Sequence, residues 1–259
     1  MRKIWRILAI VATTIAVIAF FVYWAGPVGL SIWTAWKAPS RASLTPVNLK
    51  DSSISQGPGN RLSYFGYEFE VPWNDIDGEG KLTPNRVLLT FRSGLQITAT
   101  AFPAKEFVNG VASSFFGMSP QDFEAKFGYE VTRSDYEFLN RLYEFTPKKM
   151  NYWALSSSVH YRECLLLMIK STSLLPWAAD SGIFTIRNQS YAGFQQGNPQ
   201  ARPTGFVVDL YSDEGGIEFI LNQKDYQNPA GVSQAEINRL IQSLHKIQGG
   251  APVAGLRQK

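Results

Sequence analysis

The chain has 259 residues, of which 45% are hydrophobic and 18% are charged, a composition that indicates one ordinary globular domain with an additional apolar segment. Of its 25 Lys and Arg residues, five lie in residues 1–41, where there is no Asp or Glu, so the remaining 20 stand against all 21 acidic residues. Residues 42–259 are therefore close to neutral and have no basic excess to neutralise phosphates, which excludes nucleic-acid binding as an expected function.

The first element in the chain is an apolar segment at residues 4–25 that Arg6 alone interrupts. About 20 apolar residues, each rising about 1.5 Å in a helix, cross the hydrocarbon core of a bilayer. A cleaved signal peptide is the alternative, but its apolar core has about 7–15 residues and is followed by a small-x-small cleavage site. Here the apolar core runs through residues 7–24 with no clear site of that kind after it. We therefore expect an uncleaved anchor that contacts the lipid bilayer through residues 4–25.

Basic and aromatic residues around this segment predict its orientation. Arg2, Lys3 and Arg6 favour a cytoplasmic N-terminus, because short loops on the cytoplasmic side are enriched in Lys and Arg. The aromatic residues that are placed like an interfacial belt are Tyr23, Trp24, Trp33 and Trp36. We therefore expect a cytoplasmic stub and transmembrane anchor at residues 1–37, and a single-pass protein of the cell inner (plasma) membrane with an extracytoplasmic domain.

Strands are expected soon after the membrane segment. Residues 38–60 are rich in Ser, Pro and Gly and predict a linker between membrane and domain. Apolar side chains alternate along residues 65–71, which predicts a half-buried strand. Residues 86–102 predict two strands joined by a tight turn at Ser93-Gly94, where glycine supplies a positive φ.

Three helices are expected next. Ser119 as N-cap with Pro120 at the first helical position opens one of them. Ser134 and Glu137 form a capping box for the second. The third covers residues 157–173, and its apolar run is too short to span a membrane, so we interpret it as a core helix.

The last part of the chain returns to strands and closes with a helix. Residues 182–197 predict strands, and 205–211 with 217–221 predict a second hairpin. Ser233 and Glu236 form a capping box for the final helix. Its apolar stripe at helical spacing consists of Ile237, Leu240, Ile241, Leu244 and Ile247.

Hairpins and a separate group of helices predict an α+β domain with an antiparallel sheet flanked by helices. We expect this domain at residues 61–249 and a flexible tail at residues 250–259. Cys164 is the sole cysteine, so an internal disulfide is excluded, and we interpret it as a buried, unreactive thiol.

Three stretches resemble the PsbP-like superfamily: GYEFEVP at residues 66–72, GFQQG at 193–197 and INRLIQSLHKI at 237–247. The resemblance covers residues 62–248 and implies an α/β/α sandwich, as in the membrane-anchored bacterial members of this superfamily. It also implies a role in protein binding or complex assembly. No catalytic residue and no cofactor come with it.

One acidic turn has the outline of a calcium loop. The Asp-x-Asp-Gly pattern at residues 75–78 matches positions 3, 5 and 6 of an EF-hand loop, but positions 1, 9 and 12 would be Trp73, Lys81 and Pro84. None of these three side chains is a suitable ligand, so we favour an ordinary turn after a strand. A looser calcium site remains open as the alternative, with Asn74, Asp75, Asp77 and Glu79 as its ligands.

The same loop is our candidate for partner contact, because we expect Trp73, Asp75 and Asp77 to be exposed beside a sheet edge. His160 and Cys164, four residues apart, could share a helix face. With His245 as the one other histidine, they supply too few ligands for zinc, and we interpret them as structural.

These observations favour a membrane-anchored extracytoplasmic module that binds proteins or assembles complexes, without catalytic activity or cofactors. Titratable residues are scattered, whereas enzymes gather them in one site. A cell-envelope hydrolase is the alternative, and the approach of Glu68 or Glu70 to Asp209 in a pocket would favour it. A membrane-tethered ligand carrier is a third possibility and requires a large apolar cavity. Asn188 also lies in a glycosylation sequon.

Overall fold

The computed structural model of the chain describes residues 13–17, 39–78, 80–149, 158–175, 178–201, 204–228, 230–247 and 255–256. The chain divides into a smaller unit of residues 1–45 and 142–174 and a larger unit of residues 46–141 and 175–259. None of the helices in the described ranges combines the length and apolarity that crossing a bilayer requires. The expected anchor is described at residues 13–17 alone, and the residues predicted to orient it lie outside the described ranges: Arg2, Lys3, Arg6, Tyr23, Trp24, Trp33 and Trp36.

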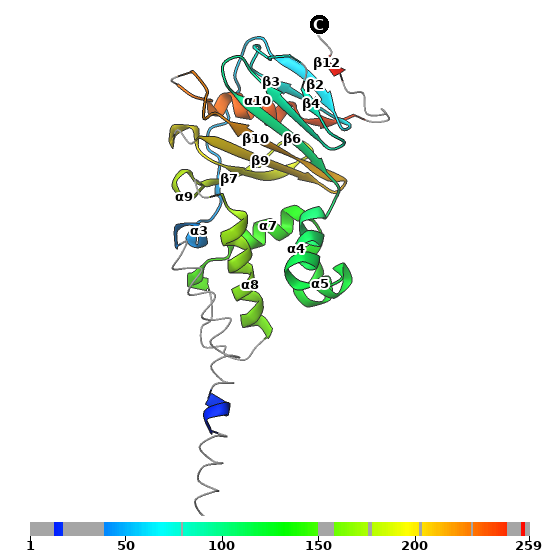
Figure 1. Cartoon of the computed structure of the whole chain (residues 1–259), viewed down its shortest axis with the longest axis vertical. Coiled ribbons are helices and arrows are strands. Elements are labelled where there is room, and N and C mark those ends of the chain that lie inside the picture. The colour runs from blue at the N-terminus through cyan, green and yellow to red at the C-terminus, as the bar shows by residue number, and fades with distance from the viewer. Residues whose placement is uncertain are drawn as a thin grey trace, which may run out of the picture. The chain divides into compact units, whose positions relative to one another are not determined.

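An eight-stranded sheet forms the centre of the larger unit (Figure 1). Its strand order is β1-β7-β8-β9-β10-β6-β5-β4. Neighbouring strands pair antiparallel except β1 and β7, which are parallel. The strands are β1 (Val47–Asn48), β4 (Lys81–Leu82), β5 (Arg86–Thr90), β6 (Gln96–Phe102), β7 (Ile183–Arg187), β8 (Ala192–Gln196), β9 (Gly205–Ser212) and β10 (Gly215–Asn222).

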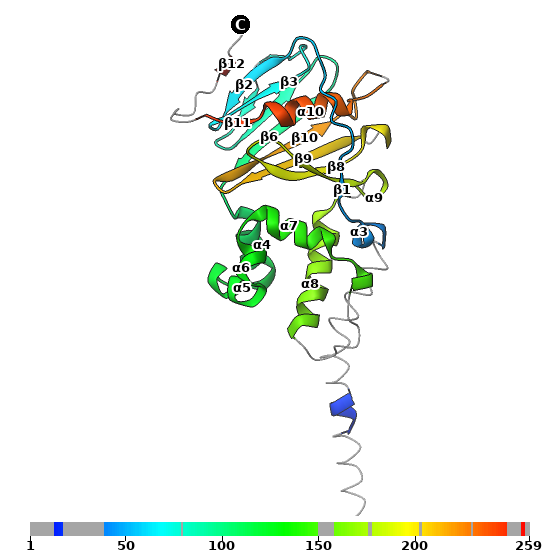
Figure 2. The same ribbon diagram turned by 180° about the vertical axis from the view of Figure 1, so that it is seen from behind.

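A second sheet of four strands, in the order β11-β3-β2-β12, covers one face of the large sheet together with helix α10. Its strands are β2 (Asn60–Tyr64), β3 (Tyr67–Val71), β11 (His245–Lys246) and β12 (Gly255–Leu256), and α10 is Gln234–Ser243. Figure 2 shows α10 in front of β6 and β10. Alternate residues of each strand point into this core, as in β9, where Phe206, Val208 and Leu210 are buried in it.

The helices of the larger unit, apart from α10, follow β6 or flank β7 and β8. They are α4 (Glu106–Phe116), α5 (Pro120–Phe127), α6 (Tyr129–Thr132), α7 (Asp135–Glu144), α9 (Ala178–Ser181) and the short 3-10 turn η3 (Pro199–Ala201). Helix α7 contacts the opposite face of the sheet, since the ring of Tyr136 stacks on Phe194 of β8 with centroids 5.3 Å apart. The larger unit is therefore a mixed α+β structure with a sheet flanked by helices.

The smaller unit contains α3 (Pro39–Ser43), the 3-10 turn η2 (Pro147–Lys149) and α8 (Ser158–Ser173). Lys170 of α8 is fully buried, and its Nζ donates hydrogen bonds to the carbonyls of Tyr143 and Phe145 at 2.7 and 2.6 Å. Tyr143 and Phe145 belong to the smaller unit and lie at the end of α7, where backbone acceptors have no partner within the helix. Burial, with a contribution from the charge on Lys149, lowers the pKa of Lys170 to about 8.

Several local predictions are confirmed. The hairpins β5–β6 and β9–β10 form as expected, and Ser119 caps α5 with Pro120 in its first turn. Helix α8 covers residues 158–173, and the capping box of Ser233 and Glu236 opens α10.

Helix α4 forms in a stretch for which no element was predicted from the sequence. One local prediction is wrong. The final helix ends at Ser243 rather than continuing to Ile247, because Leu244 is extended and His245–Lys246 pair with β3.

The stretch at residues 38–60, where we expected a linker, is partly attached to the domain. Val47 and Asn48 pair with β7, and the side-chain amide of Asn238 donates to the carbonyls of Asp51 and Ser53 at 2.9 and 2.8 Å. Within the expected tail at residues 250–259, the structure describes Gly255–Leu256, which pair with β2.

Candidate functional site

The larger unit has an open cleft of about 900 Å³ beside α7, which we call the tyrosine cleft. One wall comes from α4, α6 and the start of α7, and the other from the β7–β8 turn and the end of β9. The residues that line it are Ala104, Lys105, Asn109, Tyr129, 133–137, 187–192 and 211–213. Four tyrosines are among them: Tyr129, Tyr136, Tyr191 and Tyr211.

Asp135 joins two helices of the first wall, α4 and α7. The residue before α4, Lys105, has a left-handed φ of 60° and makes no side-chain cap. Asp135 supplies the missing acceptor, since its Oδ1 accepts a hydrogen bond from the N–H of Val108 at 2.9 Å. Burial raises the pKa of Asp135, although the backbone hydrogen bonds of the first turn of α4 counteract this effect. The carboxylate thus has a structural role at the edge of the cleft.

The β7–β8 turn in the second wall is fixed by Asn188. Its Oδ1 accepts from the N–H groups of Ser190 and Tyr191 at 2.9 and 2.8 Å. Its Nδ2 donates to the carbonyls of Ile241 and Leu244 at 2.8 and 3.2 Å, which ties the turn to the end of α10. Because this amide is committed to the backbone, glycosylation at Asn188 would disrupt the turn.

Arg187 and Tyr136 meet across the cleft. The Arg187 guanidinium lies 5.9 Å from the centroid of the Tyr136 ring, and its Nη2 donates to the Tyr136 hydroxyl at 3.3 Å. This hydrogen bond raises the pKa of Arg187. Deeper in the cleft Tyr191 is buried, and burial, with the nearby Tyr67, raises its pKa to about 12. Tyr191 is therefore neutral at physiological pH.

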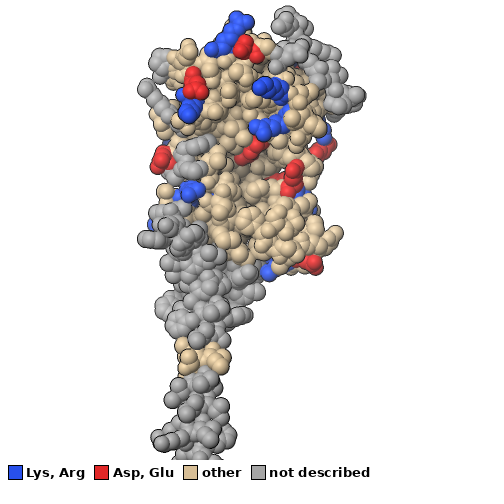
Figure 3. All heavy atoms as spheres, viewed as in Figure 1, with Lys and Arg blue, Asp and Glu red and all other residues tan. Residues whose placement is uncertain are grey.

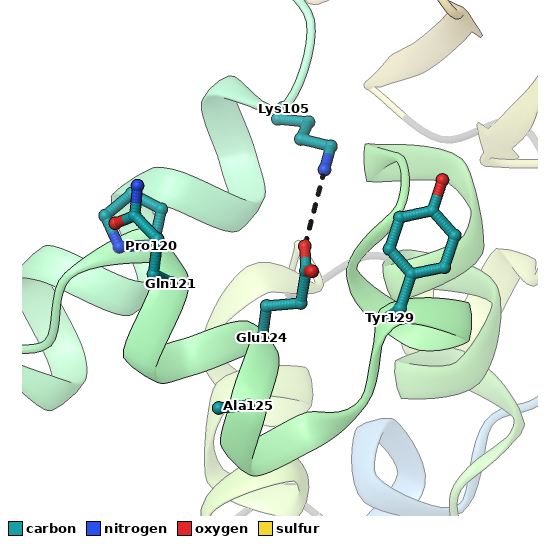
Figure 4. A pocket seen from close by; sticks show the side chains of 6 residues that line it. All are labelled: Lys105, Pro120, Gln121, Glu124, Ala125 and Tyr129. Atoms are coloured by element: carbon teal, nitrogen blue, oxygen red, sulfur yellow. Dashed lines mark ion pairs between the residues drawn. The ribbon is translucent and has the colours of Figure 1, made fainter.

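A smaller hollow of about 490 Å³ adjoins the cleft and shares Lys105 and Tyr129 with it (Figure 4). The Lys105 ammonium points toward Glu124 of α5 at 3.9 Å and lies 5.9 Å from the centroid of the Tyr129 ring. Tyr129 itself is 60% exposed. Lys105 and Tyr129 thus present one cation and one aromatic ring to both hollows.

Charges of both signs surround the cleft. Arg133 is neutralised by Glu137, with an Nη2–Oε1 distance of 2.5 Å, and lies 3.9 Å from Glu130. Acidic and basic side chains are also interspersed over the face of the molecule drawn in Figure 3. The arrangement suits a ligand with both polar and aromatic groups better than a uniformly charged polymer.

A pair of carboxyl groups lies on the sheet face that Phe194 and Tyr136 cover. Asp209 of β9 is directly opposite Glu218 of β10 in the sheet register, and Phe194 is its neighbour on the other side. Burial and the charge of Glu218 raise the pKa of Asp209 well above its ordinary value. Burial also raises the pKa of Glu218, although Arg86 counteracts this.

The arrangement that would have favoured a hydrolase is not found. Glu68 lies 3.3 Å from both Arg61 and His245, and Glu70 pairs with Arg239 at 2.5 Å. Both glutamates alternate with core residues of β3 and so point away from the core that separates β3 from the large sheet. Asp209 points to the opposite face of that sheet, and its carboxyl neighbour is Glu218.

The acidic loop predicted as a partner contact is more enclosed than expected. Trp73 is buried and packs edge-on against Phe91, with centroids 6.0 Å apart. Asp75 accepts the N–H of Ser93 at 2.7 Å. Partial burial would raise the pKa of Asp75, but the hydrogen bonds from Ser93 and the charge of Arg92 bring it below its ordinary value. The N–H of Asp77 donates to the carbonyl of Thr90 at 2.8 Å, so the loop lies beside the end of β5.

Three of the four residues of the loose calcium site are described. The amide of Asn74 donates to the carbonyl of Pro58 at 3.2 Å, and the carboxylate of Asp75 is taken by Ser93. Glu79 lies outside the described residues. No group of three or more His, Cys, Asp or Glu side chains suited to a metal ion occurs among the residues that the structure describes.

His160 and Cys164 lie in α8, as the sequence predicts, but their side chains are outside the described part of the structure. His245 is exposed in β11, where it contacts Glu68. The residues of the tyrosine cleft were not predicted as a site. The one local signal was the close spacing of polar and aromatic residues in YEVTRSDYE and RNQSY, which is equally typical of helix caps and turns.

Comparison of the chain with protein-family models, with curated proteins and with solved structures finds no match.

Proposed function

We propose that this protein is a membrane-anchored module that binds a segment of a protein partner in the tyrosine cleft and thereby helps to assemble a complex in the cell envelope. The observation that carries the proposal is the cleft itself: about 900 Å³, open, and lined by four tyrosines with Arg133 and Arg187. Tyrosine and arginine are enriched at the energetic centres of protein interfaces.

The rigidity of the cleft walls supports this role. Asn188 fixes one wall by four hydrogen bonds to backbone groups, and Asp135 joins α4 to α7 in the other. A preorganised surface loses little conformational entropy when a partner binds. The acidic residues of the first wall, Asp135 and Glu137, are engaged in a helix cap and an ion pair rather than directed at a reacting group.

The location of the module is part of the proposal. The apolar segment at residues 4–25 supports an anchor in the inner membrane, and the basic residues before it support an extracytoplasmic domain. Within the fold, we propose a PsbP-like α/β/α sandwich, because α10 lies on one side of the sheet and α7 on the other. Protease treatment of spheroplasts tests the location: digestion of the domain without lysis is expected, and protection until lysis would place it in the cytoplasm.

Site-specific photo-crosslinking in intact cells tests the binding function. Tyr129 and Tyr136, which line the cleft, are replaced one at a time by p-benzoylphenylalanine in the full-length protein. Leu82, which is 48% exposed on β4 and outside the cleft, is the matched control. We expect the two cleft positions to crosslink the same protein, identified by mass spectrometry, and Leu82 not to. Crosslinks from neither cleft position, or equal yield from Leu82, would contradict the proposal.

A further inference from the structure

We propose that the partner segment bound in the tyrosine cleft is acidic, and that Arg187 and Lys105 bind its carboxylates. This inference rests on the proposed function and specifies the chemistry of the partner. It follows from the ion pairs around the cleft, which leave these two cations with spare binding capacity while the third, Arg133, is neutralised.

Arg187 is the stronger of the two sites. It is exposed at the end of β7, and no described carboxylate forms an ion pair with it, since the pairs in the described residues use other cations. Its contacts to Tyr136, a hydroxyl at 3.3 Å and a ring centroid at 5.9 Å, use one N–H group and one face of the guanidinium. A guanidinium has five N–H donors in a planar fork that fits a carboxylate, so most of its donors remain available.

The surroundings of Arg187 hold it in place for such a contact. Its own carbonyl accepts a hydrogen bond from Nε2 of Gln242 at 3.0 Å, and the next residue, Asn188, is tied to the end of α10. The supporting ring of Tyr136 is in turn stacked on Phe194, 5.3 Å away and 19° from parallel. A guanidinium that is oriented before binding loses less side-chain entropy when a carboxylate arrives.

Lys105 supplies the second cation. Its distance of 3.9 Å to Glu124 is at the limit of an ion pair, and it rests near the ring of Tyr129 at 5.9 Å. By contrast, Arg133 contacts Glu137 at 2.5 Å. Lys105 can therefore exchange its weak partner for a carboxylate of the bound segment, whereas Arg133 would have to break a short pair.

A peptide is favoured over a phosphate polymer or an anionic lipid surface. The cleft is lined by three cations and by three acidic residues, Asp135, Glu137 and Asp213, so it has no net positive charge to hold a dense run of phosphates, whereas single carboxylates of a peptide can each contact one cation. The rings of Tyr129 and Tyr136 lie 5.9 Å from Lys105 and Arg187, respectively, and offer aromatic surface beside each cation, which suits a segment with both acidic and aromatic side chains.

The test measures binding of a fluorescently labelled random copolymer of Glu and Tyr to the full-length protein in nanodiscs of uncharged lipid, by fluorescence anisotropy. We expect binding that weakens with added salt and a loss of about tenfold for Arg187→Ala, because hydrogen bonds to charged groups are the stronger class. Lys105→Ala should lose about threefold. The matched controls Arg141→Ala and Lys224→Ala, which remove cations that do not line the cleft, should change affinity by less than about twofold.

Three results would overturn the inference. These are absence of binding, equal binding by the Lys–Tyr copolymer or by polyphosphate, and equal losses in the control variants. The photo-crosslinking experiment judges the proposed function separately. Crosslinks from the cleft together with no copolymer binding would retain a protein partner and reject its acidic character. Copolymer binding that needs Arg187, without any crosslinked protein in cells, would reject the assembly role and retain the carboxylate site.

Discussion

The carboxylate of Asp135, at the start of α7, accepts a hydrogen bond from the backbone N–H of Val108 in the first turn of α4, at 2.9 Å. The first N–H groups of a helix have no partner within it and are usually satisfied by the side chain of the preceding residue. In α4 that residue is Lys105, which makes no such bond. The helix therefore begins where it does because an acceptor arrives from another helix.

Asp135→Ala should therefore leave the first turn of α4 without this hydrogen-bond acceptor. Loss of a helix cap costs about 0.5–2 kcal/mol, and we expect a loss of stability in this range. Amide hydrogen exchange of Phe107 and Val108 should accelerate, measured in the full-length protein by mass spectrometry. Asp135→Asn keeps an acceptor oxygen and should lose less. Asp213→Ala, which removes an exposed carboxylate of the same cleft, is the control, and equal acceleration there would show that Asp135 is not the cap.

The same relationship explains which helices could be predicted from the sequence. Helix α10 was predictable because its signals are local: Ser233 and Glu236 form both bonds of a capping box, and Ile237, Leu240 and Ile241 are buried on one face. Helix α4 was not, because its cap lies 27 residues further along the chain and its interior contains Gly110. The end of α10 is likewise set by the fold, since pairing of His245 with β3 replaces the last helical turn.

The candidate site was not predictable for a related reason. Arg187 and Tyr136 are 51 residues apart and come from a strand and a helix, so no pattern in one stretch joins them. Trp73 and Asp75 were predicted as a partner contact because their residue types stand together in the sequence. In the fold, however, the indole is buried against Phe91 and the carboxylate is bound to Ser93. Local patterns predicted strands and caps, while the cleft depends on how those elements pack.

The buried carboxyl of Asp209 should make stability depend on pH. Its pKa is raised above the ordinary value of 3.8 by burial and by Glu218, so the folded protein binds this proton more tightly than the unfolded chain. Stability therefore falls as the pH rises from about 4 through the raised pKa, and stays low above it. Asp209→Asn should remove this fall and be more stable than the original protein at pH 7, on the order of 1–3 kcal/mol.

Chemical denaturation of both proteins between pH 4 and pH 8 measures this difference, and the two curves should converge at the acid end. Asp213→Asn, at an exposed position, is the control and should follow the original protein. If Asp209→Asn were the less stable protein at pH 7, the carboxylate would have to be stabilised by a cationic partner, and our account of the pair would be wrong.

Lys170 should affect the alkaline range in the opposite direction. Its pKa is lowered from 10.5 to about 8 by burial and by Lys149, so between these values the unfolded chain binds the proton more tightly. Stability should rise by about 3 kcal/mol from pH 8 to pH 10.5 through this residue and be independent of it below pH 8. Lys170→Met removes both the rise and the hydrogen bonds to the carbonyls of Tyr143 and Phe145.

The difference between the two proteins isolates Lys170 from the tyrosines that titrate in the same range. We expect the unfolding free energy of the original protein to rise relative to that of Lys170→Met as the pH increases from 8 to 10.5. Lys149→Met removes an exposed cation and should leave most of this rise in place. If the difference in unfolding free energy between the two proteins did not change with pH, Lys170 would keep its ordinary pKa and be reached by water.

Two glycine substitutions should change stability in opposite directions. A Cβ atom on Gly193 of β8 would lie 1.7 Å from the carbonyl oxygen of Asp209 and 3.0 Å from Cα of Leu210. Both contacts are with the backbone of β9, so Gly193→Ala requires two central strands to move apart and should destabilise by at least about 3 kcal/mol. At Gly110, inside α4, an added Cβ atom would have nothing within 4 Å of it.

Gly110→Ala should therefore stabilise the protein by about 0.5–1 kcal/mol, because alanine restricts the unfolded chain and favours the helix. Denaturant titration of the two variants in the same lipid or detergent environment compares them directly. Since the sequence alone did not predict α4, Gly110→Ala also tests that helix. A loss of stability there would mean that Gly110 needs a backbone conformation that alanine disfavours. A mild effect of Gly193→Ala would mean that β8 and β9 are not paired as Phe194 and Asp209 indicate.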